Sequence, residues 1–158
     1  MPYNHVYTLR HQATVSTAIS VLQLAAGALC PFEILSASAN QRGSTVSVQE
    51  KISFVRKTGA ATVTTAVVGT HLFKTKTGDP TPSLQLGTAL TGVIGTAEGT
   101  DGDNLLEEGF NVLNGWVYLP VPEERIFVPA AGIIALKFLV APASQAWDFR
   151  VTVRELGT

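Results

Sequence analysis

Alternation between apolar and polar residues is the feature that most constrains what this chain can fold into. At 148–154, Phe149, Val151 and Val153 alternate with polar residues, and 46–56 repeats the pattern with one interruption. A period of two is typical of antiparallel strands with one face on a core and the other in water. At 116–119 both alternating sets are apolar or aromatic, which predicts a strand covered on both faces. The chain is therefore predicted to be an antiparallel all-β protein.

Further strands are predicted where β-branched and aromatic residues gather between turn residues. They cover residues 5–11, 17–24, 32–38, 61–68, 83–90, 125–128 and 136–140. The best helical candidate is a single turn at 104–108. About eight strands separated by Gly and Pro predict a jelly-roll-like antiparallel β-sandwich. An immunoglobulin-like sandwich is the main alternative, although its Cys…Trp…Cys pattern is absent.

The length of 158 residues indicates one domain. We predict an extended N-terminal arm over 1–12 and a single β-sandwich domain over 13–158. Within it, an excursion around 58–102 is rich in Thr, Gly and Ala and poor in large apolar residues. Its segment 74–81 is predicted to be an exposed loop. Long loops often carry binding functions, and a variable surface excursion is equally consistent with this composition.

Charged residues are scarce, at 15% of the chain, against roughly 25% in an ordinary soluble domain. The formal net charge is −1. Without a positive excess there is no long-range attraction toward phosphates, so we predict no nucleic-acid and no membrane partner. Polar residues or prolines interrupt the apolar stretches 18–30 and 126–143, so neither is predicted to be a signal peptide or a membrane span. A soluble, unprocessed protein is expected.

Reactive motifs are absent from the sequence. No nucleophile elbow, phosphate-binding glycine loop or Ser–His–Asp grouping occurs, and the three histidines lack metal-like spacing. Cys30 is a lone thiol and is predicted to be a small buried apolar residue. Residues 101–104 begin like a calcium loop, but Val112 stands where the last ligand belongs, so a turn is predicted. The acidic pair at 123–124 is also interpreted as a turn. We predict no catalytic residues, no cofactor, no metal and no enzymatic activity.

Aromatic residues near the C-terminus suggest contacts with partners. Trp116, Tyr118 and Trp147 could form a sugar-stacking platform, although such residues more often serve as core or interface anchors. The predicted interface residues are Tyr3, Tyr7, Leu9, Trp116 and Trp147.

The C-terminal third carries a characteristic succession of strands and turns. It runs as NVLNGWVYLPV at 111–121, PEERIFVP at 122–129, AGIIALKFLV at 131–140 and APASQAWDFRVTVRE at 141–155. The first half contributes the LAA and PFEI segments and the VQE…FVRKT strand. Together these patterns resemble a type of small structural protein of tailed bacteriophages, over most of the chain.

This resemblance implies a jelly-roll-like sandwich and a role in the virion without catalytic residues. Among virion parts it favours a capsid decoration (cement) protein, a homotrimer that binds the major capsid protein on the capsid surface after assembly in the host cytoplasm. The alternative is a carbohydrate- or receptor-binding jelly-roll module on a phage tail or fibre, and a glycan partner is expected only in that case. A head–tail connector or another tail protein is a third candidate.

Overall fold

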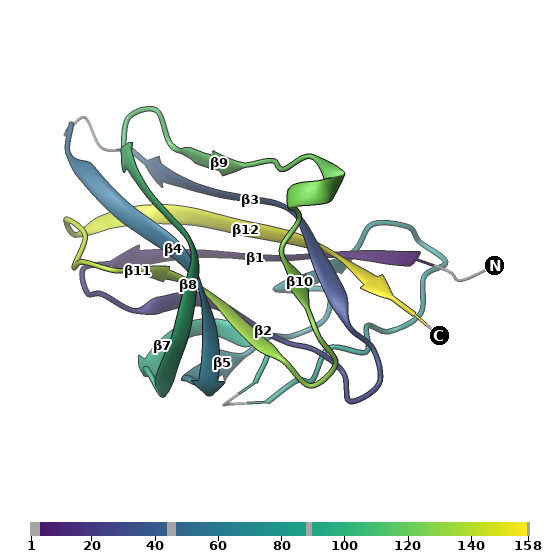
Figure 1. Cartoon of the computed structure of the whole chain (residues 1–158). Helices are drawn as coiled ribbons and strands as arrows, with labels where there is room; N and C mark the ends of the chain where they lie inside the picture. Colours follow the sequence, from purple (N-terminus) through teal and green to yellow (C-terminus); the bar gives the residue numbers. More distant parts are fainter. Residues whose placement is uncertain (1–3, 44–46, 88–89, 158) are drawn as a thin grey trace.

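The computed structural model describes residues 4–43, 47–87 and 90–157 of the chain. Nearly all regular structure in these ranges is β-strand, and η1 (Pro122–Glu124) is a single 3₁₀ turn. The strands form two six-stranded antiparallel sheets that face each other as a sandwich (Figure 1). The predicted all-β sandwich is confirmed, and η1 confirms the turn predicted at 123–124.

The two sheets are built as follows. Sheet A contains, in spatial order, β10 (Phe127–Val128), β3 (Phe32–Arg42), β12 (Gln145–Leu156), β1 (Asn4–Val15) and β6 (Leu72–Lys74), with β9 (Trp116–Tyr118) also paired to β3. Sheet B contains β5 (Thr62–Thr65), β7 (Gly92–Ala97), β2 (Ser20–Ala25), β11 (Ile133–Phe138), β4 (Gln49–Gly59) and β8 (Thr100–Asn111).

The strands pair in a nested order. β1 pairs with β12, β2 pairs with β11, β3 pairs with both β9 and β10, and β4 pairs with β8. The excursion at 58–102 lies outside this nesting and supplies β5, β6 and β7. Of these, β6 extends sheet A beside β1, whereas β7 and β5 extend sheet B beside β2. The excursion is therefore built into both layers of the sandwich, and only parts of it are surface loop.

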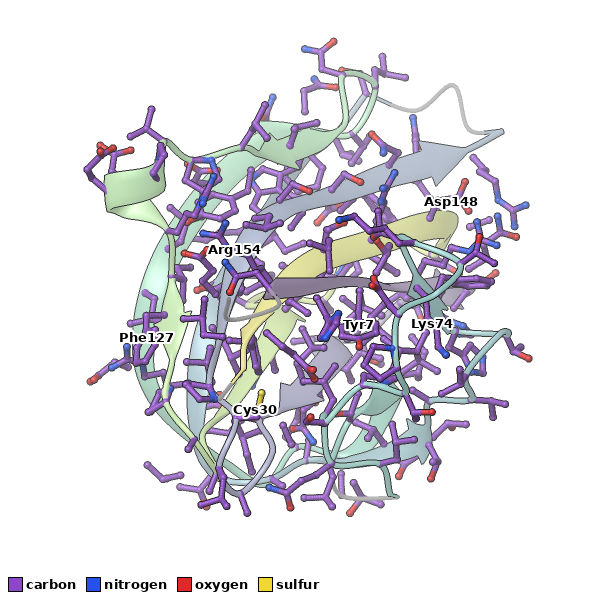
Figure 2. The ribbon with its side chains drawn as sticks, turned by 90° about the vertical axis from the view of Figure 1, so that its right-hand side faces the viewer. Tyr7, Cys30, Lys74, Phe127, Asp148 and Arg154 are labelled. Atoms are coloured by element: carbon purple, nitrogen blue, oxygen red, sulfur yellow. The ribbon has the colours of Figure 1, made fainter. Side chains whose placement is uncertain are left out.

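Residues 4–12 do not form the predicted arm. They belong to β1, which lies between β12 and β6 and pairs with β12 along its whole length. Figure 2 shows Tyr7 of β1 between Phe127 and Lys74, which mark the two edges of sheet A. The prediction is wrong because alternate residues of this segment face the core while its backbone completes a ladder. Burial of these side chains and hydrogen bonding of this backbone together hold the segment inside the sandwich.

The core lies between the sheets, and the alternation in β12 is confirmed. Phe149, Val151 and Val153 are buried, whereas Arg150 on the opposite face is exposed. β2 differs because all six of its residues are buried. Its Gln23 side chain donates hydrogen bonds to the carbonyl oxygens at 61 and 90 and accepts one from the N–H at 61. The excursion therefore covers the face of β2 that points away from the core.

Three sequence-based assignments in the second half are wrong. The turn at 101–104 and the helical turn at 104–108 both belong to β8, an edge strand whose polar sequence shows no alternation. Pairing with β4, reinforced by an ion pair between Lys51 and Glu107, holds β8 in the sheet. The segment at 83–90 is not a strand in its described part. The main-chain N–H groups of Ser83 and Leu84 donate to the Glu155 carboxylate instead of to a strand ladder.

The turn between β7 and β8 requires a glycine. Gly99 has φ +66°, and a Cβ at this position would collide with the carbonyl oxygens of Gly59 and Ala60. Only glycine combines this conformation with so close an approach of two backbones. The close contact of Gly99 with residues 59–60 holds residues 98–101 against the end of β4, where several charged side chains meet.

Candidate functional site

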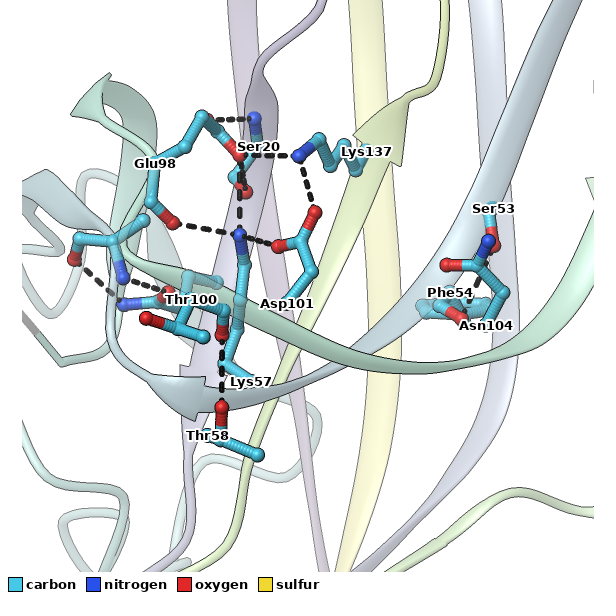
Figure 3. A network of polar contacts seen from close by, with 12 residues as sticks. Ser20, Ser53, Phe54, Lys57, Thr58, Glu98, Thr100, Asp101, Asn104 and Lys137 are labelled. Atoms are coloured by element: carbon cyan, nitrogen blue, oxygen red, sulfur yellow. Dashed lines mark hydrogen bonds and ion pairs between the residues drawn. The ribbon is translucent and has the colours of Figure 1, made fainter.

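A cluster of charged side chains joins β4, β8 and β11 to the β7–β8 turn (Figure 3). This Lys57 cluster consists of Lys57, Lys137, Glu98 and Asp101. Lys57 Nζ lies 3.1 Å from Glu98 Oε2 and 2.5 Å from Asp101 Oδ1, and Lys137 Nζ lies 2.9 and 2.6 Å from the same two carboxylates. The Lys57 side chain is fully buried, whereas both carboxylates are partly exposed. Glu98 also accepts hydrogen bonds from the main-chain N–H and the hydroxyl of Ser20.

The donors around these two carboxylates keep them ionised. Burial alone would raise the pKa of Glu98, but hydrogen bonds from Ser20, Lys137 and Lys57 outweigh burial and lower it. Burial likewise opposes the effect of the two lysines on Asp101, and its pKa is also lowered. Two lysine side chains thus face two carboxylates whose ionised forms are favoured. The Lys57 cluster is a cross-link between strands.

A second group of titratable residues lies at the end of the sandwich that carries the chain termini. A cleft of about 520 Å³ is lined there by His5, Cys30 and Glu155, among others. Burial raises the pKa of the Cys30 thiol, and the nearby Glu155 raises it further. A nucleophilic cysteine needs the opposite shift, because the thiolate is the reactive form. Glu155 holds the 83–84 backbone against β12, which is a structural task.

Most of the predicted interface residues lie in the core. Tyr7, Leu9 and Trp147 are 0% exposed and Trp116 is 4% exposed, whereas Tyr3 lies outside the described residues. As surface contacts these four predictions are wrong, because each side chain falls on the inward-facing side of its strand. An aromatic residue in a short strand gives the same sequence signal whether it faces a partner or the opposite sheet.

The two tryptophans pack against other rings inside the sandwich. The ring of Trp147 stacks on Phe149 and lies 5.1 Å from Phe138, measured between ring centroids. The ring of Trp116 packs against Phe54, and its Nε1 donates a hydrogen bond to Glu108. Neither ring is presented to solvent, so neither can serve as a sugar-stacking platform.

The surface that sequence reasoning missed is one continuous stretch, residues 113–127, which we call the edge segment. It contains β9, η1 and the start of β10. Ten large apolar side chains are exposed among the described residues, and half of them fall here. They are Leu113 (52% exposed), Val117 (66%), Leu119 (77%), Val121 (54%) and Phe127 (47%).

The local sequence explains why the edge segment is apolar on its outer side. In β9, Trp116 faces the core while Val117 points away from it. Pro120 and Pro122 interrupt strand pairing before β10, because proline cannot donate to a ladder. Within the described ranges β9 and β10 pair only with β3, so their other edge has no strand beside it. The strand predicted to be covered on both faces is thus covered by its own chain on one face only.

Comparison with known proteins reveals no relative. No protein-family model matches the chain, and neither a curated protein nor a solved structure matches it significantly. Within residues 4–43, 47–87 and 90–157, no group of three or more His, Cys, Asp or Glu residues could hold a metal ion. The same ranges contain no helix with the length and hydropathy that crossing a membrane requires.

Proposed function

We propose that this chain is a non-enzymatic structural protein of a bacteriophage virion, a decoration (cement) protein that binds across neighbouring capsid subunits and stabilises the head. The observation that carries the proposal is the edge segment, an apolar surface that the chain itself leaves uncovered. The resemblance of the sequence to small tailed-phage proteins favours the same role. The low content of charged residues also suits a surface that is buried against neighbours.

The nested strand order supports the jelly-roll form of the sandwich. The pairs β1–β12, β2–β11, β3 with β9 and β10, and β4–β8 are the pairs that form when one long antiparallel hairpin folds over on itself. In this description β9 and β10 together act as one strand, and β5 to β7 are an insertion between β4 and β8. Jelly rolls of this kind are common in viral capsid domains.

In this proposal the edge segment lies against the major capsid protein. Burying one Val, Leu or Phe side chain contributes about 1.5–3 kcal/mol. The loss of translational, rotational and side-chain freedom on binding offsets a large part of the total from several such side chains. A single contact is therefore modest, but a shell repeats it many times. An apolar contact also depends little on ionic strength, in contrast to one made by ion pairs.

Leu119→Asp is expected to reduce occupancy on purified heads of the encoding phage by about tenfold or more, because a carboxylate without a partner would be buried in an apolar contact. Occupancy is measured as chains per head on a stoichiometric gel. Val140→Asp is the matched control, since Val140 is 60% exposed and lies outside the edge segment. Wild-type occupancy for Leu119→Asp, or absence of the wild-type chain from heads, would contradict the proposal.

The proposed homotrimer is measured independently of capsids. Light scattering after size exclusion should give three times the chain mass of 16.7 kDa. A monomer in solution would overturn the trimer and leave the capsid contact to be decided by head occupancy. The alternative, a carbohydrate- or receptor-binding module on a tail or fibre, has no stacking platform in Trp116 and Trp147, because both side chains are buried.

A further inference from the structure

A cleft of about 540 Å³ opens on the face of sheet A that points away from the core. Its lining comes from three adjacent strands, β1, β12 and β3, and from residues 70–71 just before β6. The side chains that matter for binding are Arg10, Gln12, Ser38, Asn40, Asp148 and Arg150. The volume falls in the range of small-molecule sites, and the lining is polar.

Two arginines on neighbouring strands line this cleft. Arg10 and Arg150 are direct register partners in the β1–β12 ladder, so their side chains share one face, and both are exposed. Like charges directly opposite each other destabilise a sheet. Among the described residues neither guanidinium forms an ion pair, whereas on the same sheet Arg42 pairs with Asp148 at 3.2 Å and Arg154 pairs with Glu33. The Arg10–Arg150 pair thus carries positive charge that the chain does not neutralise.

The guanidinium of Arg10 is held in place without using its hydrogen-bond donors. Its Cζ lies 3.9 Å from the centroid of the Phe73 ring, a cation–π contact that fixes the guanidinium by its face. The main-chain N–H of Arg10 donates to the carbonyl oxygen of His71 at 2.8 Å, which ties β1 to the rim of the cleft. A guanidinium fixed in this way keeps its planar set of N–H donors for an anion, and it matches the geometry of a carboxylate.

The groups around the arginine pair distinguish between classes of anion. Gln12, Asn40 and Ser38 offer amides and a hydroxyl, the groups that pair with sugar hydroxyls, whereas protein-docking sites are centred on apolar and aromatic side chains. A nucleic acid would need more cations than two and a positive net charge, but the chain has a net charge of −1. We infer that this cleft binds an acidic saccharide, whose carboxylate is held between Arg10 and Arg150 and whose hydroxyls contact the amides beside them.

This inference does not depend on the capsid role. The cleft and the edge segment are neighbours on sheet A, because Val117 of β9 is the register partner of Ser38, which lines the cleft, although Asp148 and Phe127 lie apart in Figure 2. The two surfaces are formed by different residues, so saccharide binding is measured on the free chain and does not require the capsid contact.

The test is calorimetric titration of the full chain with trigalacturonic acid, with a neutral galactose trisaccharide and sodium sulfate as comparison ligands. Trigalacturonic acid should bind with a Kd in the micromolar to millimolar range, and the neutral sugar and sulfate should bind much more weakly. Arg10→Gln and Arg150→Gln should each weaken binding by about tenfold or more. Arg56→Gln removes the same charge from an exposed arginine of sheet B and should leave binding unchanged.

Several results would overturn the inference. They are no binding of trigalacturonic acid, equal binding by all three arginine variants, equal affinity for sulfate, and tighter binding of an acidic peptide such as tetraglutamate. Arg150→Gln removes one of two neighbouring like charges and should unfold at or above the wild-type temperature, whereas Arg10→Gln also loses the contact with Phe73. A lower unfolding temperature for both variants would mean that the arginines stabilise the fold, which also contradicts the inference.

Discussion

Replacing Trp147 with alanine is expected to lower the free energy of unfolding by about 3–5 kcal/mol. The ring is 0% exposed and lies among Phe110, Phe138 and Phe149, with centroid distances of 6.0, 5.1 and 6.0 Å. Loss of this side chain removes the largest ring from the core and leaves a cavity that β-sheet neighbours cannot close, because their backbones are fixed by two ladders. Equilibrium unfolding in urea measures the change.

Two variants give this experiment its controls. Trp147→Phe keeps a ring in place and should cost much less, because the indole Nε1 has no hydrogen-bond partner within the described residues and only packing is lost. Val117→Ala truncates a side chain that is 66% exposed and should change stability by less than about 0.5 kcal/mol. If Trp147→Ala cost no more than Val117→Ala, Trp147 would not be a core residue, and its earlier assignment to an interface would regain support.

The double substitution of Glu98→Gln and Asp101→Asn is expected to cost about 2–4 kcal/mol, again measured by unfolding in urea. Both substitutions preserve size, but they leave the fully buried Lys57 ammonium without an anion. The cost is set below that of a fully buried ion pair because both carboxylates are partly exposed. Glu107→Gln removes a surface carboxylate from the ion pair with Lys51 and should change stability little.

The difference in unfolding free energy between the wild type and the Glu98→Gln, Asp101→Asn double variant depends on pH with a definite sign. The pKa values of Glu98 and Asp101 are lower in the folded chain than their ordinary values of 4.5 and 3.8, so folding favours their ionised forms. Their contribution to stability is complete above those ordinary values and is lost as the pH falls through the lower folded-state values. The gap between wild type and double variant should therefore be constant near neutral pH and shrink below about pH 4. A gap that persists unchanged in acid would contradict the charge-based account.

Local sequence pattern predicts the strands whose two faces differ and fails where tertiary contacts decide. Alternation identifies the strand that ends with Val151 and Val153, because one side of it meets the core. The same rule misses β8, whose polar residues are held in the sheet by pairing with β4 and by ion pairs with lysine side chains. The Lys57 cluster could not be predicted, since register alone brings Lys57 opposite Asp101, far away in the sequence.

The edge segment shows a different limit of sequence reasoning. The apolar character of Val117 and Leu119 is evident in the sequence, but whether this chain covers them depends on which strand lies beside β9. The sequence predicts that both faces of β9 are covered, but in the structure only the face that carries Trp116 is covered by the rest of the chain. The Arg10–Arg150 pair was missed for a similar reason, because two exposed arginines at opposite ends of the chain attract no notice until β1 and β12 are placed side by side.

The pairing of β1 with β12 also determines when this protein can fold. These strands come from the two ends of the chain, and β12 lies in the middle of sheet A, between β1 and β3 (Figure 1). Sheet A therefore cannot close before β12 has left the ribosome, and the apolar side chains of β1 stay uncovered until then. Such a high contact order predicts folding on the millisecond-to-second scale. A chain truncated near its C-terminus would lose a central strand, so we expect translation that stops early to yield no partly working product.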